Sequence, residues 1–367
     1  MSAKQSELAD VIAATVNNLP DQYFEVTWDN EDYEFTRIMQ NERMEIDGGN
    51  QIERKIMFDE SGHAHYRRAF DTDDPTVENV LSTIKVGWCR LSTDYSWDDF
   101  EILQNRASPR KIVSVIKARR IDGLWSLANK IEDRAWKCPT NSTDDLYPYG
   151  VPYYINLMGT GTSTDGFVGK TIVYQDGTTG TVCANIDANT QTKWRNYAAL
   201  YTNIDNSMIK TFRKAFMKTR FKAPIILSDP GRTRAAQKRI YTDFDNTGDL
   251  MDLVDAKDDR HTSKGREALG GLTVDDSGLV YINRLPVVPI PQLEGYTPPG
   301  SSTAVAPIYC VDFRYIIPCV HEGYWMKETE PMWDRGQHTT FTVYLDGAHQ
   351  NLCLNRRKVG FVLHKAW

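Results

Sequence analysis

The longest regular pattern of apolar positions lies between Ser108 and Cys138. Ser108 is a favourable helix cap, and Pro109 suits the first helical position, where its missing N–H costs nothing. Apolar residues then recur at helical spacing, while the charged side chains fall mostly on the other faces. The apolar stripe consists of Val113, Ile116, Leu124, Leu127, Ile131 and Ala135, widened by Ile112, Ile121, Trp125 and Ala128. The pattern predicts one long amphipathic helix that packs on a sheet and ends before Pro139.

The chain before this helix begins with weaker patterns. Residues 4–18 predict a short amphipathic helix that ends before Pro20. Residues 20–43 are rich in aromatic and acidic side chains but show no sustained period. We interpret them as an arm that lies on another surface, because a short segment cannot bury those rings alone. An irregular beginning of a core is the alternative.

A β-hairpin is predicted after Gly48 and Gly49. Apolar and polar residues alternate over 52–58 and again over 64–70, and residues 59–62 supply the turn. Both strands carry many charges, so we expect neither face to be buried within one subunit. A two-stranded ribbon is marginal in water, and we therefore expect it to contact a neighbouring subunit. The candidate inter-subunit contacts are Glu53, Arg54, Lys55, Phe58, Tyr66, Arg67 and Arg68.

A long strand and a short helix are predicted between this hairpin and the long helix. The strand begins at Val80, and its apolar pattern changes face near residues 87–90, which indicates a bulge. Ser96 and Asp99 resemble a capping box for a short helix around residues 100–103.

Two later segments look like insertions peculiar to this chain. Residues 166–186 predict a hairpin with a turn at Asp176 and Gly177, and residues 243–275 form a polar, acidic stretch. Within that stretch, we interpret the residues from Asp243 to Asp249 as a solvated acidic loop.

Composition excludes several classes of protein. The 367 residues, 41% of them hydrophobic, suffice for about two domains with real cores. A net charge of −6 gives no general attraction to DNA or to acidic membranes, so any nucleic-acid contact is expected to be local. The six cysteines are dispersed, which predicts free thiols and no structural metal. Without a signal peptide or an apolar run of about 20 residues, we expect a protein made in the cytoplasm that binds no membrane and no cofactor.

One motif suggests enzyme chemistry. The run from Asp243 to Thr247 fits the D-x-D-x-T of haloacid-dehalogenase-type phosphotransferases, in which the first Asp attacks phosphorus and Mg²⁺ lies between the carboxylates. That chemistry needs the Asp at the end of a buried parallel strand, and residues 237–242 look too polar for one. A calcium loop is also disfavoured, because Val254 stands at the twelfth position, where a bidentate Glu is needed. A phosphotransferase that uses Asp243 and Asp245 stays as the alternative function.

The order and character of the elements resemble the major capsid proteins of tailed bacteriophages, whose fold is named after a Hong Kong phage. The resemblance begins with the hairpin behind Gly48, its acidic closure over 71–75, the long strand, the short helix and the long helix. It continues through segments similar to the axial domain and to the closing strands of that family. These segments are 194–201, the helix from Asn206, 223–228, 278–288, 308–313 and 351–361.

The resemblance implies an α+β fold with four parts. These are an N-terminal arm (1–47), an extended loop hairpin (48–75), a peripheral domain with a long spine helix (76–157 and 335–367) and an axial domain with possible insertions (158–334). It implies a major capsid protein that is not an enzyme. Such proteins self-assemble into hexamers and pentamers that form the icosahedral head shell around phage genomic DNA. A ring-forming tail or collar component is a weaker alternative.

The resemblance also implies the partners of the chain. These are other copies of itself, a possible scaffolding protein, portal and decoration protein, and packaged double-stranded DNA held non-specifically on the inner face. The implied location is the capsid shell of the virion, after synthesis in the host cytoplasm. The segment before Gly48 is short, so we expect any scaffolding protein to be separate. Some relatives crosslink a loop Lys to a neighbour's Asn; nothing in the sequence brings Lys55 to Asn351 or Asn355, and we expect non-covalent packing.

Overall fold

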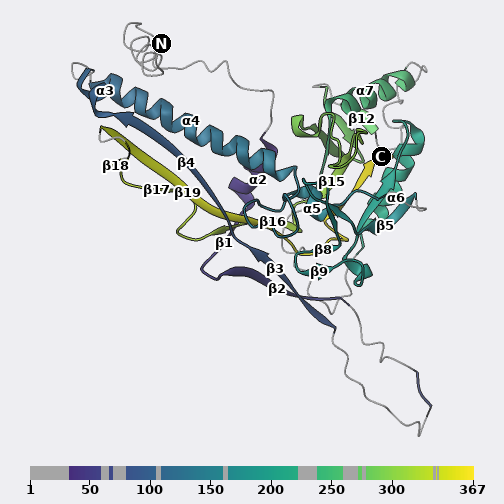
Figure 1. The fold of residues 1–367 in the computed structure, drawn as a ribbon. Helices are drawn as coiled ribbons and strands as arrows, with labels where there is room; N and C mark the ends of the chain where they lie inside the picture. Colours follow the sequence, from purple (N-terminus) through teal and green to yellow (C-terminus); the bar gives the residue numbers. More distant parts are fainter. Residues whose placement is uncertain are drawn as a thin grey trace. The chain divides into compact units, whose positions relative to one another are not determined.

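The computed structural model describes residues 33–58, 66–68, 80–104, 109–159, 164–221, 238–258, 272–274, 278–333, 336 and 339–367 (Figure 1). The chain divides into two compact units. Unit 1 takes Met1–Gly48, Arg90–Asp133 and Val320–His349, and unit 2 takes Gly49–Cys89, Arg134–Cys319 and Gln350–Trp367. None of the helices in the described ranges is long and apolar enough to cross a membrane.

Unit 1 is built from a long helix and a six-stranded sheet. Its helices are α2 (Glu34–Glu42), α3 (Asp99–Gln104) and α4 (Pro109–Ala135). Its strands are β1 (Met44–Ile46), β4 (Cys89–Asp98), β16 (Ile316–His321), β17 (Lys327–Glu328), β18 (Met332–Trp333) and β19 (Thr340–Cys353). The order is β1-β16-β19-β17, and β4 and β18 also pair with β19. The ends of α4, β4 and β19 continue into unit 2, and β16 begins in unit 2 and enters unit 1 at Val320.

The long helix confirms the prediction from the apolar stripe. Helix α4 spans 27 residues, and Leu127, Ile131 and Ala135 are buried. Ile121, by contrast, is 50% exposed, so the buried face is narrower than predicted. The predicted cap, Ser108, lies outside the described residues.

A buried carboxylate joins α4 to α2. Glu132 is fully buried, although the charged side chains of this helix were expected to lie away from its buried apolar stripe. Its Oε2 accepts hydrogen bonds from the backbone N–H groups of Phe35 and Thr36, at 3.0 and 3.1 Å. These N–H groups lie in the first turn of α2, where intrahelical partners are lacking and negative charge is favoured. Residues 34–42 are thus a helix with Phe35 and Met39 buried. The expectation that this part has no regular period is wrong, whereas its assignment to an N-terminal arm stays a prediction.

Unit 2 contains a mixed eight-stranded sheet, with the order β12-β13-β14-β11-β15-β20-β10-β5. These strands are β5 (Asp165–Gly169), β10 (Asn196–Leu200), β11 (Lys238–Thr242), β12 (Leu272–Val274), β13 (Val280–Ile282), β14 (Leu285–Pro289), β15 (Ile308–Asp312) and β20 (Gly360–His364). The short strands are β2 (Gln51–Met57), β3 (Leu81–Gly87), β6 (Ile172–Val173), β7 (Thr179–Gly180), β8 (Val182–Cys183) and β9 (Ile186–Asp187). The helices are α5 (Val151–Tyr154), η1 (Thr192–Trp194), α6 (Asn206–Thr219), α7 (Phe244–Asp258) and η3 (Pro291–Leu293).

One face of this sheet is covered by α6 and α7. Helix α6, capped by the Asp205 side chain, contacts β10 and β20 at one end of the strand order. Helix α7 contacts β12, β13 and β14 at the other end. Phe212 of α6 and Leu250 of α7 are both fully buried in the same apolar core. The helix predicted from Asn206 is confirmed, and so is the turn at Gly177, which joins β6 to β7 with φ +81°.

A fully buried arginine ties four separate segments of unit 2 together. Arg356 precedes β20, and its guanidinium has no exposed surface. It donates to the carbonyl oxygens of Tyr154 and Trp194, both at 2.9 Å, and of Gly169 at 3.3 Å. It also donates to Oδ1 of Asn196 at 3.2 Å. The planar fork of donors suits several acceptors at once, which a lysine could not match.

The six cysteines are free and buried, as the dispersed spacing predicted. Burial raises the pKa of the Cys89 and Cys310 thiols to about 12. These thiols therefore pack as small apolar side chains.

Candidate assembly surfaces

The hairpin has the predicted first strand, but its second strand is a different segment from the one predicted. Strand β2 pairs antiparallel with β3, in a register that runs from Gln51 opposite Gly87 to Met57 opposite Leu81. Residues 66–68 are not in a strand. The prediction that 64–70 forms the return strand is therefore wrong. Alternation alone could not choose between the two candidate strands, because each has a period of two residues.

One face of this β2–β3 ribbon is buried, which also corrects the sequence-based expectation. Ile52, Ile84 and Val86 are at most 3% exposed. The backbone of β3 is fixed to the turn between β8 and β9, where the Lys85 N–H donates to the Ala184 carbonyl oxygen at 3.2 Å. At the end of β2, the ring of Phe58 meets the ring of Trp194 edge-on, with 5.6 Å between centroids. The ribbon is thus held at a defined place on unit 2.

The opposite face of the ribbon is exposed. Glu53 and Lys85 lie directly opposite each other and form an ion pair of 3.3 Å. Hydrogen bonds from Gln51 and Lys85 hold the pKa of Glu53 below its usual value. At the end of the ribbon, Met57 and Leu81 are paired and are 52% and 55% exposed. These two adjacent apolar side chains make the end of the ribbon a candidate contact surface.

The remaining predicted contacts are also on the surface. Arg54 and Lys55 of β2 are exposed. Tyr66 is fully exposed, with Arg67 and Arg68 exposed beside it. The sequence analysis predicted these residues as contacts mainly from their charge, but it did not predict Met57 and Leu81 as contacts. Both are apolar in the sequence, yet Leu81 was placed outside the hairpin, so its pairing with Met57 could not be foreseen.

Unit 1 carries an aromatic strip that sequence reasoning did not find. The strip consists of Tyr95, Trp97, Phe341 and Trp333, and successive ring centroids lie 6.1, 6.1 and 4.1 Å apart. Trp333 is 58% exposed. Arg120 of α4 binds the Glu328 carboxylate through two hydrogen bonds, at 3.0 and 3.2 Å, and Tyr95 donates to the same carboxylate. These bonds connect α4 and β17 to the aromatic strip through one carboxylate.

The motif considered for phosphotransfer has a structural role here. Thr242 ends β11, a central strand that pairs parallel with β14, and Asp243 is only 4% exposed. Oδ1 of Asp243 accepts from the Asn246 N–H at 2.9 Å, which is the bond of a helix N-cap. Burial raises the pKa of Asp243, whereas Asp245 is exposed on the first turn of α7. The residues before Asp243 are therefore a strand of the sheet, although they looked too polar for one. The interpretation of the residues from Asp243 as a solvated loop is also wrong.

The asparagines considered for a crosslink are engaged within the chain. Asn351 is 2% exposed, and its Nδ2 donates to the Tyr149 carbonyl oxygen at 2.8 Å. Oδ1 of Asn355 accepts from the Arg357 N–H at 3.0 Å. Within the described residues, no group of three or more His, Cys, Asp or Glu side chains could hold a metal ion.

Comparison with solved structures finds other proteins with a similar fold. The capsid asymmetric unit of cyanophage A-1(L) superposes with a TM-score of 0.58 at 12% identity, covering 95% of this chain and 96% of that one. The capsid of Myoviridae phage XM1 gives 0.52 at 9% identity, covering 96% and 98%. The chain has the tailed-phage capsid fold. Neither a protein-family model nor a curated protein matches the sequence.

The capsid fold extends over nearly the whole chain. The capsid of the empty GTA particle gives a TM-score of 0.50 at 10% identity and covers 98% of both chains. The α+β class and the capsid fold predicted from the order of elements are thus confirmed. Only about one residue in ten is identical between this chain and these structures. The similarity therefore lies in the order of helices and strands and not in a shared sequence motif.

Proposed function

We propose that this protein is a major capsid protein that self-assembles into the icosahedral head shell of a phage, around double-stranded DNA. The observation that carries the proposal is the capsid fold over nearly the whole chain. The end of the β2–β3 ribbon supports it, since two paired apolar side chains are exposed there and offer a surface for contact with another copy. The protein acts through its surfaces, and its location is the virion.

In this proposal α4 is the spine helix, and β2 belongs to the extended loop, which pairs through β2 with strand β3 of the peripheral domain. The assignment of residues 48–75, 76–157 and 335–367, and 158–334 to loop, peripheral domain and axial domain is part of the proposal. Glu53, Arg54, Lys55 and Phe58, with Tyr66 to Arg68, are the polar and aromatic part of the contact with the neighbouring subunit. Met57 and Leu81 are its apolar part.

Hexamers and pentamers are the rings of this proposal. A ribbon that reaches over a different surface of the next copy makes a heterologous contact, and such contacts form rings when the rotation between copies closes. Several weak contacts per subunit combine through effective concentration, so a shell is stable although each contact can be corrected. Scaffolding, portal and decoration proteins, and DNA on the inner face, are the further partners in this proposal.

The test compares the sedimentation of the wild type with that of Met57→Ser/Leu81→Ser. The wild type is expected to sediment as shells. The variant loses two side chains that are more than half exposed, so it should stay folded and sediment as subunits or small rings. Leu146→Ser/Leu279→Ser is the matched control, because those leucines are 60% and 47% exposed elsewhere on the chain.

Two outcomes would contradict the proposal. A wild type that remains monomeric under all assembly conditions would remove the capsid function. Shells from the ribbon variant in wild-type yield would show that the ribbon end is not a contact. A ring of fixed size from the wild type, without shells, would favour the tail or collar component.

A further inference from the structure

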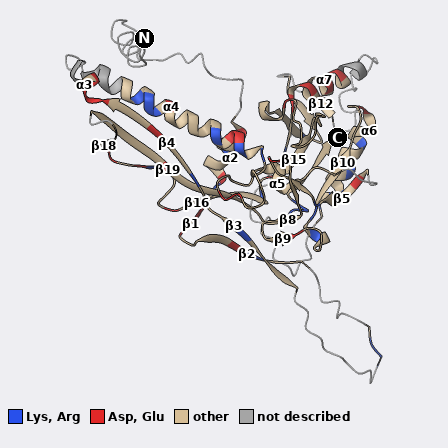
Figure 2. Ribbon diagram, viewed as in Figure 1, with Lys and Arg blue, Asp and Glu red and all other residues tan. Residues whose placement is uncertain are grey.

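The two helices on the α6–α7 face of the eight-stranded sheet have opposite charge (Figure 2). Helix α6 has no acidic residue between Asn206 and Thr219. Its basic stripe, at helical spacing, comprises Lys210, Arg213, Lys214 and Lys218. Helix α7 presents an exposed acidic stripe at positions i, i+4 and i+7, formed by Asp245, Asp249 and Asp252. Each helix buries its apolar side against the sheet, so the charged stripes are directed outward.

The two stripes do not neutralise each other within one subunit. Helix α6 covers the β10 and β20 end of the sheet, and α7 covers the β12 end. In the described part of the chain, Lys210, Asp249 and Asp252 form no ion pair. Lys214 does form one, with Asp165 of β5. The charges of Lys210 and of the two aspartates are therefore available to a partner.

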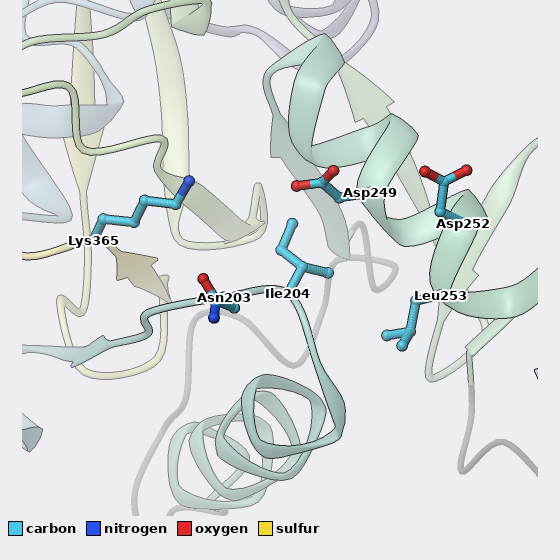
Figure 3. A pocket seen from close by; sticks show the side chains of 6 residues that line it. All are labelled: Asn203, Ile204, Asp249, Asp252, Leu253 and Lys365. Carbon is cyan, nitrogen blue, oxygen red and sulfur yellow. The ribbon is translucent and has the colours of Figure 1, made fainter. Parts of the chain in front are cut away.

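A hollow lies beside the acidic stripe (Figure 3). Its volume is about 350 Å³, and it is lined by Asn203, Ile204, Asp249, Asp252, Leu253 and Lys365. Two apolar side chains and two carboxylates thus face the same space. On α6, Met217 is 70% exposed and lies between Lys214 and Lys218 in sequence. An exposed apolar side chain flanked by lysines can complement a hollow whose lining combines two apolar side chains with two carboxylates, beside Asn203 and Lys365.

We infer that the basic stripe of α6 in one copy binds the acidic stripe of α7 in the next copy, with Met217 in the hollow. The inference rests on the proposed function and names one contact within its rings. The two surfaces are different and do not overlap, as a heterologous contact requires. A duplex DNA would also attract α6, but it would leave the acidic stripe without a partner. A second copy of the chain accounts for both stripes.

Charge reversal with reciprocal rescue tests the contact. Lys210→Glu/Lys218→Glu and Asp249→Lys/Asp252→Lys should each lower the yield of shells at low salt by roughly tenfold or more, because like charges then face each other. The chain that carries all four substitutions should recover most of the yield. All four side chains are exposed, so circular dichroism and limited proteolysis are expected to match the wild type.

Mixing the two variants gives a sharper readout. At the four exchanged positions, one variant then carries only acidic side chains and the other only basic ones, so contacts through these positions are attractive only between unlike chains. Strict alternation fits a six-membered ring but not a five-membered one. A one-to-one mixture should therefore form hexamers and open hexameric arrays, while closed shells that need pentamers stay rare.

The control is Lys117→Glu/Lys130→Glu on α4, which changes the net charge by the same amount as the α6 variant, at exposed positions. It should assemble close to wild-type yield. The inference is overturned if the four-substitution chain is not rescued, if the control loses as much yield, or if reversal on α7 has no effect while reversal on α6 lowers only DNA content. A wild type without shells would instead remove the proposed function.

Discussion

Replacing Arg356 by Met should be among the most destabilising single changes in unit 2. The guanidinium is completely buried and donates four hydrogen bonds, three of them to backbone carbonyl oxygens. Met keeps most of the side-chain volume but has no donor. A buried acceptor that loses its donor costs about 1–3 kcal/mol. Relief of the buried charge offsets part of this loss, so we take the lower value for each bond and expect a loss of about 4 kcal/mol.

Such a loss is a large share of the roughly 5–15 kcal/mol that a domain has. Urea denaturation of the subunit under non-assembling conditions measures it directly. Thermal unfolding should show a melting temperature lower by about 8–16 °C, at roughly 2–4 °C per kcal/mol for units of 150–250 residues. The matched control is Arg357→Met. The Arg357 guanidinium lies 4.2 Å from the centroid of the Phe167 ring, a contact worth about 0.5–1 kcal/mol near a surface.

The reasoning is refuted if Arg356→Met unfolds within about 1 kcal/mol of the wild type, or if the two variants lose equal stability. Either result would mean that the four acceptors find other donors once the guanidinium is gone. Arg356→Lys should fall between the wild type and Arg356→Met, because an ammonium group can serve at most three of the four acceptors.

Three further predictions concern folding of the subunit. Burial lowers the pKa of His349 from 6.5 to about 4. Its contribution to the stability of the folded state is therefore complete above pH 6.5 and is lost as the pH falls toward 4. His349→Gln should reduce the stability change between pH 7.5 and pH 5 by about 2 kcal/mol in urea titrations. Burial raises the pKa of Asp243, so the cost of its charge in the folded state grows as the pH rises above the usual pKa of an Asp and is complete once the pH exceeds the raised pKa. Asp243→Asn keeps the cap and should be at least as stable as the wild type at pH 7, whereas Asp243→Ala should lose about 1–2 kcal/mol; equal unfolding midpoints for the two variants would contradict the capping role. Leu127→Ala should cost about 2–5 kcal/mol, because Leu127 is 5% exposed, and exposed Lys130→Glu should change stability by no more than about 0.5 kcal/mol; the reverse ranking in the same titrations would show that the buried face of α4 is misassigned.

The elements that sequence predicted correctly have strong local signals. Helix α4 begins at a Pro that suits a first turn and ends before the next Pro, with a repeated apolar stripe between them. Helix α6 has the Asp205 cap and an apolar stripe against β20. These signals lie within one turn or one period of the chain, so a single sequence contains them.

The features that sequence did not predict depend on distant partners. Strand β2 could have paired with either of two alternating segments, and only the tertiary structure selects β3. Helix α7 was taken for a loop because acidic residues dominate its exposed side, whereas Leu250 and Val254 supply its buried side. Arg356 has four acceptors that lie between 160 and 202 residues away in sequence. No local pattern marks such a residue.

Electron cryo-microscopy of the purified full-length chain tests the central claim most directly. The account predicts closed shells built from five- and six-membered rings, with the β2–β3 ribbon of each subunit lying on a neighbour and α6 facing α7 of the next copy. Monodisperse monomers, or rings that never close into a shell, would contradict it.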